Sequence, residues 1–301
     1  MLTKPDGKVT AQPGMKFSHN YVRGLSFQGF HRIHYTDWNN RPDIQDQDTL
    51  VCVHGVSRNG RDFDYLAERM MDQYRVVCPD MVGRGESDHL LTHKGYDYLQ
   101  YNADMNAVLA RLDVGKVDWV GTSMGGIIGM VFASLPQSPI KKLVLVDVGP
   151  EISRDSLLKI GEYIGLAGEF KTREALKEYM REIYKDFYPL SEDDLDHMFE
   201  HAAVRTKQGK FKLRMDPAIG DAFREDISLF DVDMWETWDN ISCPVLIVRG
   251  KESQFFSQET AKEMLTRGPE TTLIEMEHAG HTPTLRNDEQ VDPIRKWLLE
   301  N

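Results

Sequence analysis

Residues 117–130 read VDWVGTSMGGIIGM, and this short stretch decides the fold. VDWV is an apolar run of strand length, whereas GGIIGM begins an apolar helical segment. Between them Gly121, Ser123 and Gly125 match the pattern G-x-S-x-G, which requires a strand before it and a helix after it. We therefore predict a sharp turn that raises the Ser123 hydroxyl above a sheet.

The residues beside Ser123 suit a nucleophile. Such a turn brings backbone close to backbone, and Gly121, Gly125 and Gly126 provide positions without a side chain. Ser123 also lies near a predicted helix N-terminus, where free N–H groups favour developing negative charge. The N–H of Met124 is therefore a predicted donor to an oxyanion.

A second oxyanion donor is expected from an earlier strand end. In LVCVHGV, residues 50–56, an apolar run leads into His54 and Gly55. Gly55 allows a tight turn that directs the N–H of Val56 to the same point as that of Met124. Two such donors are the usual stabiliser in acyl transfer. Because backbone groups carry this role, His54 is predicted to be structural.

A general base for Ser123 is expected on a late loop. EMEHAGHTPTL, residues 275–285, follows the last strand-like run and contains His278 and His281. Gly280 gives flexibility before His281, and Pro283 stiffens the loop after it. We predict His281, rather than His278, as the base.

Strand-like and helix-like segments alternate along most of the chain. Six apolar runs show the little alternation that is typical of strands covered on both faces: TLVCVHG, YRVVCPD, VDWVGTS, KKLVLVDVG, PVLIVRG and TTLIEME. Helical segments separate them, which predicts an α/β fold with a mainly parallel sheet. Residues 16–38 are aromatic and β-branched, and we expect them to form antiparallel edge strands.

One long interval breaks this rhythm before PVLIVRG. Residues 150–240 are mostly helical in pattern, which predicts a helical cap inserted into a core made of residues 1–149 and 241–301. One helix carries apolar residues that we expect to form the core of the cap: Leu176, Tyr179, Met180, Ile183, Tyr184 and Phe187.

A rival motif lies within this insertion. His197, Glu200 and His201 match H-x-x-E-H, a pattern of zinc peptidases. On a helix, all three fall opposite an apolar face that includes Leu195 and Met198. A solvated helix face explains them, so we predict no metal site here.

The composition argues against several kinds of partner. The chain of 301 residues has 48 acidic and 36 basic residues and a formal charge of −12, whereas nucleic-acid binding needs clustered Lys and Arg. No apolar run reaches the ~18 residues that span a bilayer, and the N-terminal residues lack the apolar stretch of a signal peptide. We expect a cytoplasmic protein with no membrane partner. The oligomeric state is not indicated.

These motifs together resemble the α/β-hydrolase superfamily, and within it the bacterial serine hydrolases and carboxylesterases with a helical cap. The resemblance covers nearly the whole chain, with HGVSRNG, DMVGRGESD, GTSMGG, LVLVDVGP, PVLIVRG and AGHTP in the expected order. It implies Ser123 as nucleophile and His281 as base. It also implies Val56 and Met124 as oxyanion donors, and no metal or organic cofactor.

Two further residues carry the resemblance. Asp80 and Arg84 in DMVGRGESD match a turn that is structural in the family. Haloalkane dehalogenases and epoxide hydrolases share the fold but place an aspartate where this chain has Ser123, which argues against both activities.

The third member of a catalytic triad departs from the family pattern. The family places an Asp three or four residues after the glycine of PVLIVRG, where this chain has Ser253 and Gln254. Asp147, at the end of the strand after the nucleophile helix, is our prediction for the acid. Glu252 in the loop and a triad without a carboxylate are the alternatives.

The resulting hypothesis is a serine hydrolase that cleaves small to medium apolar esters through an acyl-serine intermediate. Two alternatives stay open. The same Ser and His serve carbon–carbon bond hydrolases and enol-lactonases, whose pockets differ. A non-catalytic binding protein is the third hypothesis, supported by the absent loop acid.

Overall fold

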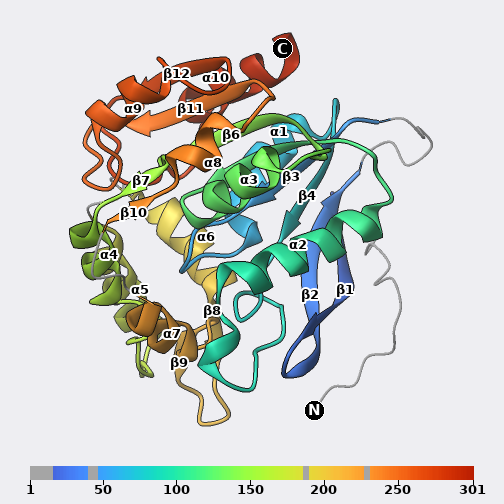
Figure 1. The fold of residues 1–301 in the computed structure, drawn as a ribbon. Helices are drawn as coiled ribbons and strands as arrows, with labels where there is room; N and C mark the ends of the chain where they lie inside the picture. The colour runs from blue at the N-terminus through green and yellow to red at the C-terminus, as the bar shows by residue number, and fades with distance from the viewer. Residues whose placement is uncertain (1–15, 40–46, 186–189, 227–230) are drawn as a thin grey trace.

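The computed structural model describes residues 16–39, 47–185, 190–226 and 231–301, and its centre is an eight-stranded sheet (Figure 1). In spatial order the strands are β1 (Ser18–Ser26), β2 (Gly29–Trp38), β4 (Arg75–Pro79), β3 (Thr49–Val53), β5 (Val117–Thr122), β6 (Ile140–Val146), β11 (Val245–Gly250) and β12 (Thr271–Met276). The pairs β1–β2 and β2–β4 are antiparallel, and the strands from β4 to β12 run parallel. The predicted mostly parallel sheet with antiparallel edge strands is confirmed.

Both faces of this sheet are apolar because the parallel strands are apolar at consecutive positions. In β11, Val245 and Ile247 pack into one hydrophobic core, whereas Leu246 and Val248 pack into the other. Successive side chains of a strand point to opposite faces. A continuous apolar run therefore supplies two cores at once, and helices must cover both sides.

The helices of the core divide between the two faces. Helices α2 (Tyr98–Leu112), α3 (Met124–Ser134) and α9 (Gln258–Met264) contribute to the first core, and α1 (Asp64–Met70) and α10 (Asp288–Glu300) to the second. Two short 3-10 helices, η1 (Gly60–Phe63) and η2 (His93–Gly95), lie in loops. Among the residues described, no helix is both long and apolar enough to cross a membrane.

The segment between β6 and β11 forms a separate layer. It contains β7 (Glu151–Ile152), α4 (Arg154–Gly161), α5 (Arg173–Tyr184), α6 (Glu192–Ala202), β8 (Ala203–Arg205), β9 (Phe211–Leu213), α7 (Ala218–Asp226), β10 (Val232–Asp233) and α8 (Trp235–Asp239). Figure 1 shows most of it at the end of the sheet to which the arrowhead of β11 points. The parallel strand ends therefore face this insertion.

Part of the insertion has a small core of its own. Leu176, Met180 and Tyr184 of α5 are buried against α6, with Tyr179 and Ile183 partly buried beside them. The predicted apolar stripe thus packs as a core, and Phe187 lies outside the described residues. Tyr184 also lines a cavity beside the parallel strand ends.

Candidate active site

Ser123 stands on a strained turn between β5 and α3. Its backbone has φ 49° and ψ −115°, in a region that residues with a side chain rarely adopt. The Ser123 N–H donates to Val146 O at 3.0 Å, and its carbonyl accepts from the N–H groups of Gly126 and Ile127. These bonds hold the turn, and strain of this kind is concentrated at functional sites.

The glycines on either side of Ser123 are required by close backbone contacts. A Cβ on Gly121 would lie 2.3 Å from Gly125 O, and a Cβ on Gly125 would lie 2.0 Å from Val53 O. Neither backbone neighbour can move without breaking the β3–β5 pairing or the first turn of α3. The sequence pattern G-x-S-x-G is therefore a packing requirement at this position.

The two predicted oxyanion donors border the same cavity as Ser123. Met124 is the first residue of α3, so its N–H has no carbonyl acceptor one turn earlier in the helix. Val56 follows the end of β3. Val56, Ser123, Met124 and His281 all line one cavity. The structure thus brings both predicted donor residues to the nucleophile.

The buried side chain of Arg84 contacts both Val56 and Met124. Its side chain is fully buried and donates to Val56 O at 2.9 Å and to Val82 O at 2.8 Å. Its Nη2 also lies 3.8 Å from Met124 Sδ. The family resemblance implied a structural role for Arg84. The guanidinium plays this role by contacting both the loop after β3 and the first residue of α3.

His54 and Asp80 are buried and hydrogen-bonded away from the nucleophile. His54 Nδ1 lies 2.7 Å from Gly55 O, and its Nε2 accepts from the N–H of Met81. Burial lowers the pKa of His54 to about 4, so the ring is neutral at ordinary pH. Asp80 accepts from His34 and from two backbone N–H groups. Both residues stabilise loops at the strand ends.

His281 is hydrogen-bonded to Asp147. Its Nδ1 lies 2.8 Å from Asp147 Oδ2, and both side chains are buried. Because a carboxylate only accepts, a neutral ring carries its proton on Nδ1, and Nε2 is then the nitrogen that can accept a proton. Asp147 directly follows β6 and also accepts from the N–H of Gly250 at 2.9 Å. This is the arrangement in which a carboxylate orients an imidazole.

The alternative carboxylate, Glu252, lies elsewhere. It is exposed, and its nearest basic partner is His278, with Glu252 Oε1 and His278 Nδ1 3.9 Å apart. Gln254 is also exposed and accepts from Lys159 of α4 at 3.0 Å. The structure therefore brings together Ser123, His281 and Asp147, and leaves Glu252 and His278 outside the group.

The loop after β11 contributes two side chains that sequence reasoning missed. Ser253 Oγ donates to Asp147 Oδ2 at 2.5 Å and accepts from the N–H groups of Phe255 and Phe256. The ring of Phe255 lies against His281, with centroids 4.3 Å apart. The sequence marked Ser253 only as a residue at the family's acid position, and it gave no signal for the role of its hydroxyl or for Phe255. Ser253 meets Asp147 because β6 and β11 are neighbours, and Phe255 meets His281 because β12 lies on the other side of β11.

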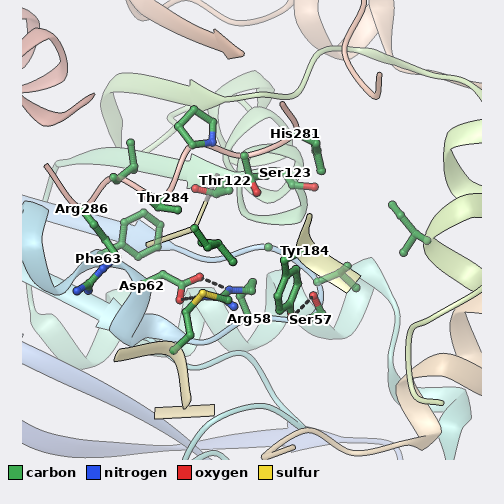
Figure 2. A pocket seen from close by; sticks show the side chains of 18 of the residues that line it. Ser57, Arg58, Asp62, Phe63, Thr122, Ser123, Tyr184, His281, Thr284 and Arg286 are labelled. Carbon is green, nitrogen blue, oxygen red and sulfur yellow. Dashed lines mark hydrogen bonds and ion pairs between the residues drawn. The ribbon is translucent and has the colours of Figure 1, made fainter. Parts of the chain in front are cut away.

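Two cavities of unlike character meet at Ser123 and His281. The larger, of about 430 Å³, is mostly apolar, and we call it the large chamber; its walls include Ile127, Val131, Ile152, Leu157, Phe223 and Phe255. The smaller, of about 60 Å³, we call the small chamber; its walls include Ser57, Arg58, Asp62, Phe63, Tyr184 and Arg286. Figure 2 shows Ser123 and His281 on one side of the small chamber and Arg58, Asp62 and Tyr184 on the other.

The H-x-x-E-H motif lies at the contact between the insertion and the core. His197 and His201 face Asp64 of α1, and ligand atoms of these three residues all lie within 4.8 Å of one another. Glu200 points away and pairs with Arg173. The prediction that all three face solvent is therefore wrong for the two histidines, because α6 packs against α1 and η1.

Hydrogen bonds to Arg61 explain why His197 and His201 lie beside Asp64. His197 Nε2 lies 3.0 Å from Arg61 O, and Arg61 donates twice to Asp64 at 2.5 and 2.7 Å. His201 Nδ1 lies 3.3 Å from the Arg61 guanidinium, which can only donate. Burial and Arg61 lower the pKa of His201 to about 3. Arg61 occupies the space beside the acid that a cation would use, so the group forms a polar joint.

The fold, together with Ser123, His281 and Asp147 at the ends of its parallel strands, defines a class of protein. This class is a hydrolase with a serine on a strand–helix turn. Residues 48–288 match the family model described as the alpha/beta hydrolase fold. The match covers well over half of the chain, and the chain belongs to the α/β-hydrolase family. It is a hydrolase of that fold.

Individual relatives agree with this assignment. The chain is 39% identical over 291 residues to a 3-hydroxybutyrate-oligomer hydrolase of Cupriavidus necator, covering 94% of this chain and 97% of that protein. A solved α/β hydrolase from Novosphingobium aromaticivorans is 31% identical, with a TM-score of 0.85 over 95% of this chain and 99% of the other. An esterase from Exiguobacterium antarcticum is 22% identical, with a TM-score of 0.68 over 92% and 97% of the two chains, a likeness of fold alone.

Proposed function

We propose that this protein is a serine ester hydrolase in which Ser123, His281 and Asp147 form the catalytic triad. One observation carries the proposal. A serine on a strained turn lines the same cavities as a histidine whose Nδ1 is 2.8 Å from a buried carboxylate. Nucleophile, base and orienting acid are the three parts that acyl transfer through serine requires.

The reaction follows from these positions. Ser123 Oγ bonds to the ester carbonyl carbon while His281 Nε2 takes its proton, and the N–H groups of Val56 and Met124 receive the oxyanion. The tetrahedral intermediate then breaks the carbon–oxygen bond to the alcohol, which leaves with the proton from His281. A water molecule, deprotonated by His281, attacks the acyl-serine and releases the acid.

The insertion, residues 150–240, acts in this proposal as the cap over the site. Ile160 of α4 and Tyr184 of α5 line the small chamber, and Leu157 and Phe223 line the large one. Both chambers therefore have one wall from the core and one from the insertion. The substrate contacts both parts of the chain when it reaches Ser123.

The substrate class that fits best is a short oligoester of a 3-hydroxy acid. The relative from Cupriavidus necator is named for the hydrolysis of 3-hydroxybutyrate oligomers, and such oligomers are joined by ester bonds. The large chamber, at about 430 Å³, lies within the ~300–1,000 Å³ of small-molecule sites and is mainly apolar. An aliphatic acyl chain suits that lining.

Turnover of defined esters tests the proposal. Purified protein is expected to hydrolyse p-nitrophenyl butyrate and the linear 3-hydroxybutyrate dimer. Absence of any burst or turnover with both would overturn it. An enol-lactone and a ring-cleavage diketo acid serve as comparison substrates, and a higher kcat/KM for either than for the esters would move the assignment to that reaction.

Covalent labelling separates an enzyme from a binding protein of the same fold. A fluorophosphonate probe is expected to label Ser123, because only a serine activated by a base reacts readily with it. The Ser123→Ala variant provides the matched control and should take up no label. An unlabelled wild-type protein would contradict the proposed nucleophile.

A further inference from the structure

The two chambers beside Ser123 differ in charge as well as in size. The charged residues that line the small chamber are Arg58, Arg286 and Asp62; Arg58 is paired with Asp62, and Arg286 with Asp194 at 2.8 Å. Those that line the large chamber are Asp97 and Asp147, both acidic. An anionic end of a substrate is therefore disfavoured in the large chamber, and the small chamber is the one that offers it guanidinium donors.

Arg58 and Ser123 lie on opposite sides of Gly55. The point where a Cβ would stand on Gly55 lies 3.7 Å from Ser123 Cβ and 4.0 Å from Arg58 Cγ. Because Gly55 has no Cβ, no side chain stands between Ser123 and Arg58 at this point, and all three residues line the small chamber. A group leaving from the carbonyl at Ser123 enters the space beside Arg58 directly.

The guanidinium of Arg58 is charged and held in place. Its Nε and Nη2 donate to Asp62 at 2.7 and 2.5 Å, and its Cζ lies over the Tyr184 ring, 4.9 Å from the ring centroid. Burial lowers the pKa of Arg58, but Asp62 and Tyr184 outweigh burial, so this pKa lies above its ordinary value. Arg58 therefore stays protonated in the chamber.

Arg58 retains donors that Asp62 does not use. A guanidinium has five N–H groups; Asp62 accepts two, and the Tyr184 hydroxyl is a further partner. The hydroxyls of Ser57 and Tyr184, 3.3 Å apart, face the same chamber. A cation flanked by two hydroxyl groups is a donor set suited to a carboxylate.

We propose that the small chamber binds the free carboxylate of the leaving hydroxy acid through Arg58, Ser57 and Tyr184. The acyl part of the substrate lies in the large chamber. This inference rests on the proposed ester hydrolysis and deepens it. In a linear oligomer of a 3-hydroxy acid, the free carboxylate is on the alcohol side of the last ester bond. The orientation therefore selects that last bond for cleavage.

The size of the small chamber sets the length of the leaving group. Its volume of about 60 Å³ is a few times the ~10–15 Å³ that one water needs by the same kind of measure. It accommodates one short hydroxy-acid unit and not two. The enzyme therefore removes single units from the carboxylate end, while the remaining chain occupies the large chamber.

The first test compares two forms of one substrate. The wild-type protein is expected to hydrolyse the linear 3-hydroxybutyrate dimer with kcat/KM about tenfold or more above that of its methyl ester, the scale of one charge-assisted hydrogen bond. Equal values within twofold would overturn the inference and leave ester hydrolysis intact. No hydrolysis of either dimer or of p-nitrophenyl butyrate would overturn both proposals.

The variant for this test keeps the buried charges balanced. Arg58→Gln alone leaves Asp62 without its partner, so the double variant Arg58→Gln/Asp62→Asn is used. Its preference for the free acid is expected to fall to within twofold. Arg61→Gln/Asp64→Asn is the matched control, because it removes a similar ion pair that lines neither chamber. Loss of the preference in the control, or its survival in the Arg58 variant, would contradict the assignment.

A labelled trimer tests the direction of cleavage. With ¹³C in the carboxyl-terminal unit only, the first product is expected to be labelled monomer together with unlabelled dimer. Labelled dimer as the first product would overturn the claim that single units leave from the carboxylate end.

Discussion

The ends of β6 and β11 lie side by side, yet they contribute to the site in different ways. Val146 and Val248 pair at the end of the shared ladder, and the N–H of Asp147 donates to Val248 O at 2.8 Å. The β6 end places its acid directly on the strand terminus, where it is buried. The β11 end has a longer loop, which turns Ser253 inward to that acid and Gln254 outward to solvent.

From this difference we expect that the acid and its supporting hydroxyl can exchange places between the two adjacent strand ends. A carboxylate must reach His281 Nδ1, and both strand ends are within reach of that atom. When the acid comes from β6, the loop after β11 is free to hold it with a hydroxyl. In the proposed triad, an acid from β6 therefore takes the place of the acid that the β11 loop lacks.

The largest effect should come from removing the acid at β6. Asp147→Asn is expected to lower kcat by about 10⁴-fold, as for the triad aspartate of serine proteases, because the imidazole loses its orientation and its compensating charge. Glu252→Gln is the matched control in the other loop and should change kcat by less than about twofold, since an exposed surface group carries little energy. Turnover of p-nitrophenyl butyrate measures both. A large loss of kcat in Glu252→Gln would mean that the acid comes from the loop after β11 instead of from β6.

An exchange of the two residues tests the equivalence of the strand ends. Asp147→Ser/Ser253→Asp should recover part of the activity lost in Asp147→Ser and remain about 10²-fold below wild type, the cost of a carboxylate misplaced by about 1 Å. Asp147→Ser/Gln254→Asp should recover nothing, because position 254 faces Lys159. Rescue by position 254 instead of 253 would contradict the observed loop geometry.

Removing the hydroxyl of Ser253 should have a smaller effect. Ser253→Ala is expected to lower kcat about tenfold with little change in KM, because a hydrogen bond to a charged group contributes ~1.5–3 kcal/mol. The acidic limb of the pH–kcat profile should also move, since the charge density on Asp147 changes. Ser253→Thr keeps the hydroxyl and should restore both. A loss of stability without a shift of the profile would limit Ser253 to a purely structural role.

The smallest effect is expected at the outward end of the same loop. Gln254→Ala removes an exposed contact with Lys159 and should alter kcat by less than about twofold and the free energy of unfolding by at most ~0.5 kcal/mol. Urea denaturation and ester turnover measure the two quantities. A strong effect here would mean that the loop acts as one rigid unit instead of through Ser253.

Much of this protein could be predicted from local pattern. The continuous apolar runs predicted a parallel sheet because strands buried on both faces need apolar residues at every position. The turn at Ser123 could be predicted because only glycine fits beside Val53 O and Gly125 O. His281 was predicted as the base from its place on the loop after the last strand, and its role as base is part of the proposed function. These features depend on residues that are close together in sequence.

The histidines of the insertion show where local pattern fails. The helical period correctly separates the apolar Leu195 and Met198 from the polar His197 and His201. It cannot show that another part of the chain packs against the polar side of the helix. Arg61 and Asp64, more than a hundred residues earlier, cover that side. A polar helix face that looks solvated in sequence is here a joint between insertion and core.

By itself, the sequence determined the order of strands and helices, the turn that carries Ser123 and the loop that carries His281. Each of these is encoded by neighbours within a few residues, through periodicity, glycine and the ends of apolar runs. The tertiary structure alone decided which carboxylate meets His281, that Ser253 holds it, and that Arg58 and Tyr184 face one chamber. Those contacts join residues more than a hundred positions apart, and only the packing of neighbouring strand ends against the insertion brings them together.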